Sequence, residues 1–319
     1  MTTILVMGAA GYLGQAAVRE AVAAGHRVRG LVRRVDGADK VKALGGEPVM
    51  GDVLDVGPWK ASLDGVDVLV DLVQPALPKR ITRTSIEAVA KTRVAGTRAV
   101  GAAVMAMAED KRPLYLSVGG CDELATASDG TMGDKAPLRM PPQGGGRIGV
   151  PVHAMLRELG VRAAFVYFGI VYGPGKAFAS TILPEMKKGK LPIIGSGKNR
   201  LPIIHVEDAA RVLSHLAGLG RDAIAGKSFV AAQPGGSTAE TFFNAIAAGM
   251  GVRPPRHVPA WLVGIIAGAG SVELMATDGD VQPEGLLASG FSFRYPAIDG
   301  GVRAMLDAYA RTTPGSVVS

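Results

Sequence analysis

Three glycines stand at the junction between the first apolar run of the chain and the first helical pattern. Gly8, Gly11 and Gly14 follow the strand-like run Thr3–Met7 and open the helix-like segment Tyr12–Ala24. In such a turn the first glycine permits a tight bend, the second lets the backbone approach a pyrophosphate, and the third lets helix and strand pack closely. The helix N-terminus also offers free N–H groups and a partial positive charge to phosphates. In this position the glycines predict a dinucleotide-binding turn; a tight turn without a ligand is the alternative. The same turn is predicted to contact the cofactor through Ala10, Tyr12 and Leu13.

Strand-like and helix-like segments alternate through the rest of the first half. Further strands are predicted at Val28–Val32, Pro48–Met50, Val66–Leu72, Leu114–Val118 and Ala163–Phe168, and helices at Ala38–Leu44, Ser85–Ala108 and Pro151–Leu159. Near-continuous apolar strands separated by helices indicate a parallel sheet that is covered on both faces. Right-handed crossovers then give an α/β fold with a doubly wound parallel sheet.

The pattern becomes irregular and rich in turns after Gly169. We therefore expect a dinucleotide-binding domain over residues 1–170 and a smaller, interleaved C-terminal substrate lobe over residues 171–319. Leu201–His205 and Ser228–Ala232 are predicted to return to the main sheet. The aperiodic stretch Glu123–Gly149 predicts a functional or mobile loop. The apolar segment Pro259–Val272 is shorter than the roughly 20 residues that a membrane span needs, so it predicts a buried helix or part of the substrate lobe.

Composition narrows the class of partner. The formal net charge is +7, but the basic residues are scattered, and no zinc spacing or aromatic stacking motif accompanies them. This favours an anionic cofactor or a small-molecule substrate over nucleic acid. Cys121 is the single cysteine, and the chain opens on an apolar run without a charged leader. We therefore expect a cytoplasmic protein without a disulfide, a metal site or a membrane anchor.

The end of the second strand carries the signal for cofactor preference. Arg33 and Arg34 directly follow Val32, where an NAD-selective site would place a carboxylate for the ribose 2′-hydroxyl. Arginine suits the dianionic 2′-phosphate of NADP because it makes charge-assisted, bidentate contacts. Asp36 is nearby but lies beyond the strand end. The pattern predicts NADP over NAD, and solvated surface arginines are the alternative.

Other strand ends complete the predicted cofactor site. Asp52, followed by Val53, comes after the third strand, where a carboxylate can accept a hydrogen bond from the adenine amino group; a turn aspartate is the alternative. The fourth and fifth strands contribute further predicted cofactor contacts, namely Leu72, Val73, Gln74 and Ser117.

These motifs resemble the extended branch of the short-chain dehydrogenase/reductase superfamily, the NAD(P)-dependent epimerase/dehydratase type. The resemblance rests on the Gly8–Gly14 turn, Gly51-Asp52-Val53, Tyr172-Gly173-Pro174-Gly175 and the run Leu201–Asp208, and it covers nearly the whole chain. It implies a Rossmann fold, a nicotinamide cofactor, a C-terminal lobe that often binds a nucleotide sugar, and frequent homodimers.

The residues of the usual catalytic triad are missing. Members of this family carry a tyrosine and a lysine four residues apart, and the corresponding positions here are Gly145 and Gly149. The position of the family's catalytic serine is Gly119, while Ser117 matches an earlier serine nearer the strand. Because loss of a general acid or base typically lowers the rate by about 10²–10⁴, an active enzyme would need another proton source.

Several polar residues near the carboxyl edge of the sheet are candidates for that role. We select Asp122 and Arg147 as catalytic candidates; a loop carboxylate beside Glu123 and a solvated arginine are the alternatives. Gln74, Cys121 and His153 are further candidates, although Cys121 and His153 fit packing roles at least as well. Substrate contacts are predicted at Gly119, Phe168, Tyr172 and Arg200.

The glycine run itself suggests the nature of the substrate. Gly144–Gly146 and Gly149 are predicted to open space beside the nicotinamide, and Phe168, Ile170, Val171 and Pro259–Ile266 are predicted to make that space apolar. Three functions remain open: an NADP(H)-dependent reductase of a small hydrophobic metabolite with an atypical proton source, a redox-neutral isomerase or cyclase, and a non-catalytic NADP-binding sensor or subunit.

Overall fold

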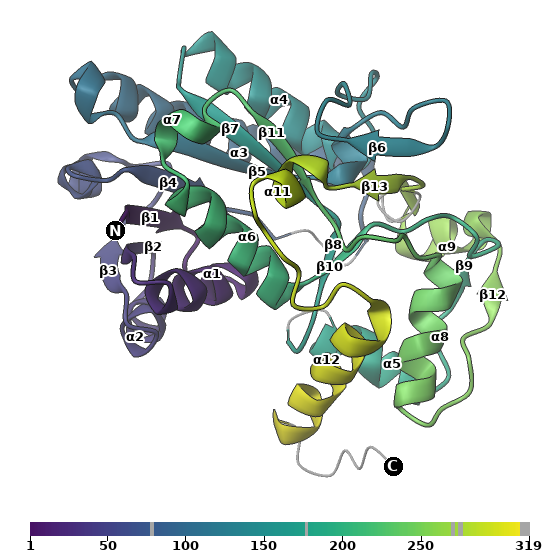
Figure 1. Cartoon of the computed structure of the whole chain (residues 1–319). Coiled ribbons are helices and arrows are strands. Elements are labelled where there is room, and N and C mark those ends of the chain that lie inside the picture. Colours follow the sequence, from purple (N-terminus) through teal and green to yellow (C-terminus); the bar gives the residue numbers. More distant parts are fainter. Residues whose placement is uncertain (77–79, 176–177, 269–271, 274–276, 313–319) are drawn as a thin grey trace.

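A seven-stranded parallel sheet forms the centre of the protein (Figure 1). The computed structural model describes residues 1–76, 80–175, 178–268, 272–273 and 277–312. The strand order is β11-β7-β5-β4-β1-β2-β3, and every neighbouring pair is parallel. The strands are β1 (Thr3–Met7), β2 (Arg27–Val32), β3 (Glu47–Met50), β4 (Val68–Asp71), β5 (Leu114–Gly120), β7 (Ala163–Phe168) and β11 (Ser228–Ala231). The predicted doubly wound α/β class is confirmed.

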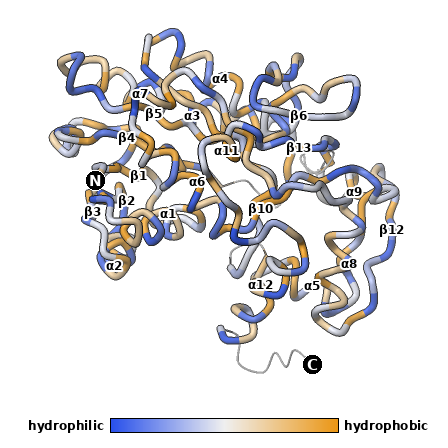
Figure 2. Tube along the Cα trace, in the orientation of Figure 1, coloured by the Kyte–Doolittle hydropathy of each residue, from blue (hydrophilic) through white to orange (hydrophobic). Residues whose placement is uncertain are grey.

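Helices cover both faces of this sheet, so side chains from both faces of each strand are buried. In β1, Ile4 and Val6 face one apolar core and Leu5 and Met7 face the other. This is why the strands read as continuous apolar runs, which Figure 2 shows as orange segments at the centre of the fold. The first core is completed by α1 (Tyr12–Ala23), α2 (Val35–Ala43) and α6 (Val206–Gly218), and the second by α3 (Arg83–Met105) and α4 (Gly146–Glu158).

A second lobe lies beside the carboxyl edge of the sheet (Figure 1). Its core contains Tyr172, Phe178, Leu183, Phe242 and Met305, all buried. Its main elements are β8 (Ile170–Tyr172), the π-helical turn Phe178–Ile182, α5 (Leu183–Lys187), β9 (Ile193–Ile194), β10 (Ile203–His205), α8 (Ala239–Gly249), β12 (His257–Val258), α9 (Ala260–Ala267) and α12 (Ile298–Thr312). Shorter elements are η1 (Gly57–Leu63), η2 (Glu109–Lys111), η3 (Cys121–Glu123), β6 (Thr131–Gly133), α7 (Arg221–Ile224), β13 (Asp280–Gln282) and α11 (Glu284–Ala288).

The two segments expected to return to the main sheet behave differently. Ser228–Ala231 pairs with β7 as the edge strand β11. Ile203–His205, in contrast, pairs with β8 in a separate two-stranded sheet, so the prediction for Leu201–His205 is wrong. The reason is that β11 already fills the free edge of β7. Gly169 connects β7 to β8. A Cβ at Gly169 would lie 2.7 Å from the carbonyl carbon of Pro202, so only a glycine lets the two backbones approach this closely.

Two further expectations need correction. The helix predicted at Pro151–Leu159 starts earlier, at Gly146, because its glycine-rich first turn hides the helical pattern. The stretch Glu123–Gly149 accordingly contains β6 and this first turn. Pro259–Val272, predicted to be a buried helix or part of the substrate lobe, contains α9 of the second lobe; this helix is not buried throughout, because its Trp261 and Ile265 are 68% and 62% exposed. The side chains of 266–267 and all of 269–271 lie outside the described residues. A search of the described residues finds no helix with the length and apolar character of a membrane span.

Candidate functional site

Two positions of the glycine turn between β1 and α1, Gly8 and Gly14, leave no room for a side chain. Gly8 has a φ of +79°, and a Cβ there would lie 2.8 Å from the carbonyl oxygen of Leu72. A Cβ on Gly14 would overlap the carbonyl oxygen of Gly8. The N-cap residue of α1 is Gly11, which has no side chain to accept a hydrogen bond from the first amides of the helix. Such a turn fits a pyrophosphate, which accepts hydrogen bonds from free helix amides.

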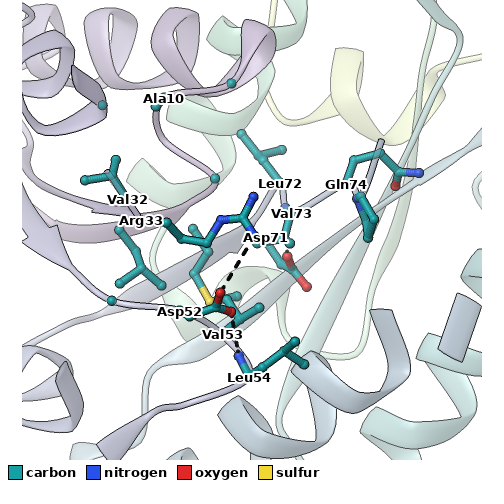
Figure 3. A pocket seen from close by; sticks show the side chains of 18 of the residues that line it. Ala10, Val32, Arg33, Asp52, Val53, Leu54, Asp71, Leu72, Val73 and Gln74 are labelled. Carbon is teal, nitrogen blue, oxygen red and sulfur yellow. Dashed lines mark hydrogen bonds and ion pairs between the residues drawn. The ribbon is translucent and has the colours of Figure 1, made fainter. Parts of the chain in front are cut away.

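A cavity of about 600 Å³ extends from this turn along the carboxyl edge of the sheet. That volume lies in the range of ordinary ligand sites. Its lining brings together ten of the predicted cofactor residues, Gly8, Ala10, Gly11, Arg33, Arg34, Asp52, Val53, Leu72, Val73 and Gln74. Figure 3 shows these strand ends converging from β1, β2, β3 and β4.

Three cationic side chains line the end of this cavity that is next to the C-terminus of β2. Arg33, Arg34 and Lys40 all belong to its lining. Arg33 Nη1 lies 3.7 Å from Asp52 Oδ2, as Figure 3 shows, and its side chain is 78% exposed. Arg34 Nε donates to Asp36 Oδ1 at 3.0 Å, and this hydrogen bond lowers the pKa of Asp36. Surface ion pairs of this kind are weak, so the guanidinium groups can turn toward a phosphate at little cost.

A second cavity of about 480 Å³ continues from the first toward the second lobe. The two cavities share Gly11, Asp71, Leu72, Val73, Gln74 and Arg93. The other predicted cofactor residues of the glycine turn, Tyr12, Leu13 and Gly14, line the second cavity. Most of its remaining lining is apolar, with Val118, Ile170, Val171, Phe178, Ile182, Leu201, Phe242 and Phe243. The site is thus one groove with a cationic end and an apolar end.

A buried charged cluster lies where the two cavities meet. Arg93 Nη1 donates to Asp71 Oδ1 at 2.7 Å, and the hydroxyl of Tyr115 donates to Asp71 Oδ2 at 2.6 Å. Asp71 and Arg93 are only 2% and 6% exposed, and Tyr115 is fully buried. Our sequence analysis did not select Arg93 or Asp71. The available signal was the buried stripe of α3, on which Arg93 follows Val89 and Ala90 at helical spacing among apolar residues.

The glycines at the positions of the missing triad do not leave an empty space, which corrects the expectation of an open apolar space there. A Cβ on Gly119 or on Gly149 would overlap the carboxyl group of Glu123. A Cβ on Gly144 or Gly145 would lie 2.8 Å from Asp122 Oδ2. Two carboxyl groups from the turn η3 therefore fill the volume that serine, tyrosine and lysine side chains would need.

Glu123 is held in this volume without a charged partner. Its Oε1 accepts the backbone N–H of Gly120 at 2.9 Å, and its Oε2 lies 3.4 Å from His153 Nε2. Burial raises the pKa of Glu123 to about 8 and, with Arg157 and Arg93 nearby, lowers the pKa of His153 to about 4. Around neutral pH both groups are mainly uncharged, so their contact is between neutral groups and is not an ion pair. His153 Nδ1 lies 3.1 Å from the hydroxyl of Tyr167 on its other side.

The two predicted catalytic residues have structural partners. Asp122 Oδ2 accepts the backbone N–H of Gly145 at 2.6 Å, at the start of α4, where a carboxylate stabilises the helix. Arg147 Nε donates to Glu273 Oε2 at 3.1 Å. Among the described lining residues of the two cavities neither Asp122 nor Arg147 occurs, so their catalytic roles stay predictions without a contact to the groove.

The predicted substrate residues also lie outside the lining of both cavities, as far as the described residues show. Phe168 packs in the first sheet core and Gly119 lies against Glu123. Tyr172 is fully buried, and its hydroxyl lies 3.4 Å from Gln233 Oε1. Arg200 pairs with Asp278 at 3.4 Å. The predicted cofactor residue Ser117 is 1% exposed, and its Oγ has no partner among the described residues. Of the apolar lining, the sequence predicted Ile170 and Val171.

Within the described ranges, no group of three or more His, Cys, Asp or Glu side chains is placed to hold a metal ion.

Comparison with known proteins agrees with this geometry. Residues 1–119 match the model of the NmrA-like family, and residues 258–305 match a domain of unknown function, DUF1731. An uncharacterized protein from Schizosaccharomyces pombe is 30% identical over 220 residues, which cover 66% of this chain and 68% of that protein. A ketoreductase from Stigmatella aurantiaca, named for 4-hydroxy-2-methyl-3-oxo-4-farnesyl-3,4-dihydroquinoline-1-oxide, is 42% identical over 64 residues, which cover 20% of this chain and 19% of the enzyme.

Among solved structures, the human epimerase family protein SDR39U1 with NADPH is similar to this chain with a TM-score of 0.80. It is 21% identical, and the superposition covers 96% of this chain and 99% of the human protein. The fold and the glycine turn define a Rossmann-type dinucleotide-binding protein. The chain belongs to the same family as the Schizosaccharomyces pombe protein, and its first 119 residues are similar to the NmrA-like family.

Proposed function

We propose that the protein is an NADP(H)-dependent reductase of a small hydrophobic metabolite. The observation that carries this proposal is the two-part groove, cationic beside Arg33 and Arg34 and apolar beyond Leu72–Gln74. A dinucleotide laid along the carboxyl edge of a doubly wound sheet would place its phosphates at the glycine turn. Its reactive ring would then reach the second cavity.

The cationic end supports a preference for the phosphorylated cofactor. Arg33, Arg34 and Lys40 surround the part of the cavity next to the end of β2, where the adenosine ribose of a bound dinucleotide lies in this fold. Titration of the purified protein with NADPH and NADH tests this preference. We expect Arg33→Ala to weaken NADPH binding and to leave NADH binding nearly unchanged. Equal weakening of both would overturn the preference for NADP.

The apolar end supports a hydrophobic substrate. Phe178, Phe242 and Phe243 approach it from the second lobe, Val118 from the end of β5 and Val171 from β8. The direct test is the loss of NADPH absorbance on addition of apolar carbonyl probes, such as phenanthrenequinone and a long-chain aldehyde. We expect NADPH oxidation with at least one probe. Tight NADPH binding with no turnover of any probe would favour a non-catalytic binding subunit.

A redox-neutral isomerase is the second candidate, because the similar human protein is named as an epimerase family member. This candidate predicts product formation without net consumption of cofactor. The apolar lining of the second cavity counts against a sugar nucleotide as its substrate, because the phosphates and hydroxyls of such a ligand need polar partners. Binding of a sugar nucleotide in that cavity would favour the isomerase over the reductase.

A further inference from the structure

Arg93 is placed to meet a ligand from either cavity. It lines both of them at their junction, although it is only 6% exposed. Among the described residues that line the second cavity, Asp71 and Arg93 are the only charged ones, so Arg93 is the only cation there. Burying an ion pair in a largely apolar cavity is expensive, which makes Arg93 and Asp71 candidates for a functional role.

The guanidinium group is fixed in place from behind. Asp71 accepts from Arg93 at 2.7 Å and is itself held by the Tyr115 hydroxyl at 2.6 Å and the backbone N–H of Val73 at 3.1 Å. Burial, the largest single effect, would lower the pKa of Arg93, but the charge and hydrogen bond of Asp71, together with Tyr115 and Glu123, outweigh burial and raise it, so the group stays charged. Glu123 also acts on Arg93 electrostatically, but burial keeps this carboxyl mainly protonated around neutral pH.

Arg93 also keeps hydrogen-bonding capacity for a ligand. A guanidinium group carries five N–H donors in a planar fork. Within the described residues, the side-chain hydrogen bond of Arg93 goes from Nη1 to Asp71. Because Arg93 lines both cavities, its side chain borders open space. The remaining donors can therefore face an oxygen atom in the groove.

We propose that Arg93 binds the carbonyl oxygen of the substrate and takes over the role that a tyrosine hydroxyl plays in related enzymes. This inference rests on the proposed reductase function. It explains how the protein can dispense with the triad whose positions are Gly119, Gly145 and Gly149. Asp71 and Tyr115 are then positioning residues, which hold the guanidinium group but do not touch the substrate.

The chemistry balances with groups already named. With NADPH held in the groove, the carbonyl carbon would receive its hydride and form the new C–H bond, and NADPH would be oxidised to NADP⁺. The π electron pair of the carbonyl group moves onto oxygen, where the N–H groups of Arg93 stabilise the negative charge. Water delivers the proton that completes the alcohol. Removal of one preorganised donor to such an oxygen typically lowers kcat by about 10²–10³.

The proposal also defines the class of ligand, an apolar molecule with one carbonyl group. An apolar carboxylate is a stable mimic of the charged oxygen, because it places a negative oxygen on an apolar body. Naphthoate therefore serves as a binding probe that needs no turnover, and phenanthrenequinone serves as the carbonyl probe for NADPH oxidation.

The variant must remove Arg93 without leaving the buried Asp71 carboxylate unpaired, since removing one partner of a buried ion pair strongly destabilises a protein. We therefore choose the double variant Asp71→Asn/Arg93→Met. The matched control is Arg98→Met/Glu158→Gln, which removes an exposed ion pair of 3.4 Å between α3 and α4. A third variant, Arg93→Lys, keeps the positive charge and loses the planar fork. Circular dichroism and thermal unfolding show whether each variant is folded.

We expect the Asp71→Asn/Arg93→Met variant to bind naphthoate about tenfold more weakly or worse, the loss expected for a charge-assisted hydrogen bond. Its kcat with phenanthrenequinone should fall by about 10²–10³. Guanidinium ion added to solution should restore part of this rate. The kcat and the naphthoate affinity of Arg93→Lys should lie between those of the wild type and those of the Asp71→Asn/Arg93→Met variant. The Arg98→Met/Glu158→Gln control should match the wild type. NADPH affinity should be unchanged in all of them.

Each other outcome is decisive. Equal naphthoate binding by the wild type and the Asp71→Asn/Arg93→Met variant would overturn the role of Arg93, as would no naphthoate binding by the wild type. A loss of NADPH affinity as large as the loss of naphthoate affinity would assign Arg93 to a cofactor phosphate and would also overturn it. A wild-type protein that binds naphthoate through Arg93 but oxidises NADPH with no carbonyl probe would overturn the reductase function instead.

Discussion

The carboxyl group of Glu123 fills the space that a side chain on Gly149 would enter. Glu123 belongs to the turn after β5, and Gly149 lies on α4. A Cβ on Gly119 would overlap the same carboxyl group from the strand side. The resemblance to family enzymes places the catalytic lysine at Gly149 and the catalytic serine at Gly119. The buried carboxyl group of Glu123 therefore occupies space that the side chains of a triad would need.

Gly149→Ala is expected to destabilise the protein because the new methyl group collides with a buried carboxyl that has little room to move. Overpacking of this kind costs about 1–3 kcal/mol. The control is Gly300→Ala on α12, where a Cβ would lie 3.8 Å from the nearest atom, in Tyr295. Replacing that exposed helical glycine should leave stability unchanged or raise it by about 0.5–1 kcal/mol. Thermal unfolding of both variants measures the difference, and equal stabilities would contradict this packing.

The raised pKa of Glu123 predicts how stability depends on pH. An acid that binds its proton more tightly in the folded protein stabilises it fully below the unfolded pKa, near 4.5, and loses this contribution as pH rises toward the folded value of about 8. Glu123→Gln cannot ionise. The free energy of unfolding of this variant should therefore rise relative to the wild type by about 1.4 kcal/mol per pH unit across that window.

Denaturant unfolding of the two proteins at a series of pH values measures this slope. His153 titrates in both proteins, so its contribution largely cancels in the difference. A difference that does not change between pH 5 and pH 8 would show that Glu123 ionises normally in the folded protein.

Gly8→Ala is expected to abolish cofactor binding. The φ of +79° and the 2.8 Å approach to the carbonyl oxygen of Leu72 act together there. Gly25 has a φ of +81° with no atom within 4 Å of its Cβ position, so Gly25→Ala imposes the backbone strain alone, about 1–3 kcal/mol. Both variants should lose stability, but only Gly8→Ala should lose NADPH binding. Normal NADPH affinity in Gly8→Ala would mean that the turn does not hold the cofactor.

The parts of the site that could be predicted from the sequence are those fixed by local backbone geometry. The glycine turn, Arg33 after β2 and Leu72–Gln74 after β4 all lie at strand ends, and parallel strands bring their carboxyl ends to one edge. Arg93 lies inside a helix, and its importance depends on its contact with Asp71 at the end of β4. This contact joins segments that are 22 residues apart in the sequence. The helical spacing of the buried α3 face was the one local signal available for it.

The prediction of open space beside Gly144–Gly149 failed for a related reason. A glycine run shows where side chains are missing, but it does not show what fills the volume. Glu123 has the sequence context of a loop carboxylate, yet its side chain is buried against Gly149 of this run and against Gly119. Phe168 was assigned to the substrate because it ends a strand, and Tyr172 because of the family resemblance, but both pack in apolar cores.

The most direct test of the whole account is a crystal structure of the protein with NADPH and naphthoate. The account predicts a 2′-phosphate beside Arg33 and Arg34, phosphates at the Gly8–Gly14 turn, and a carboxylate within hydrogen-bond distance of Arg93 at the entrance of the apolar cavity. A nicotinamide ring outside the second cavity, or a naphthoate carboxylate that makes no contact with Arg93, would contradict it.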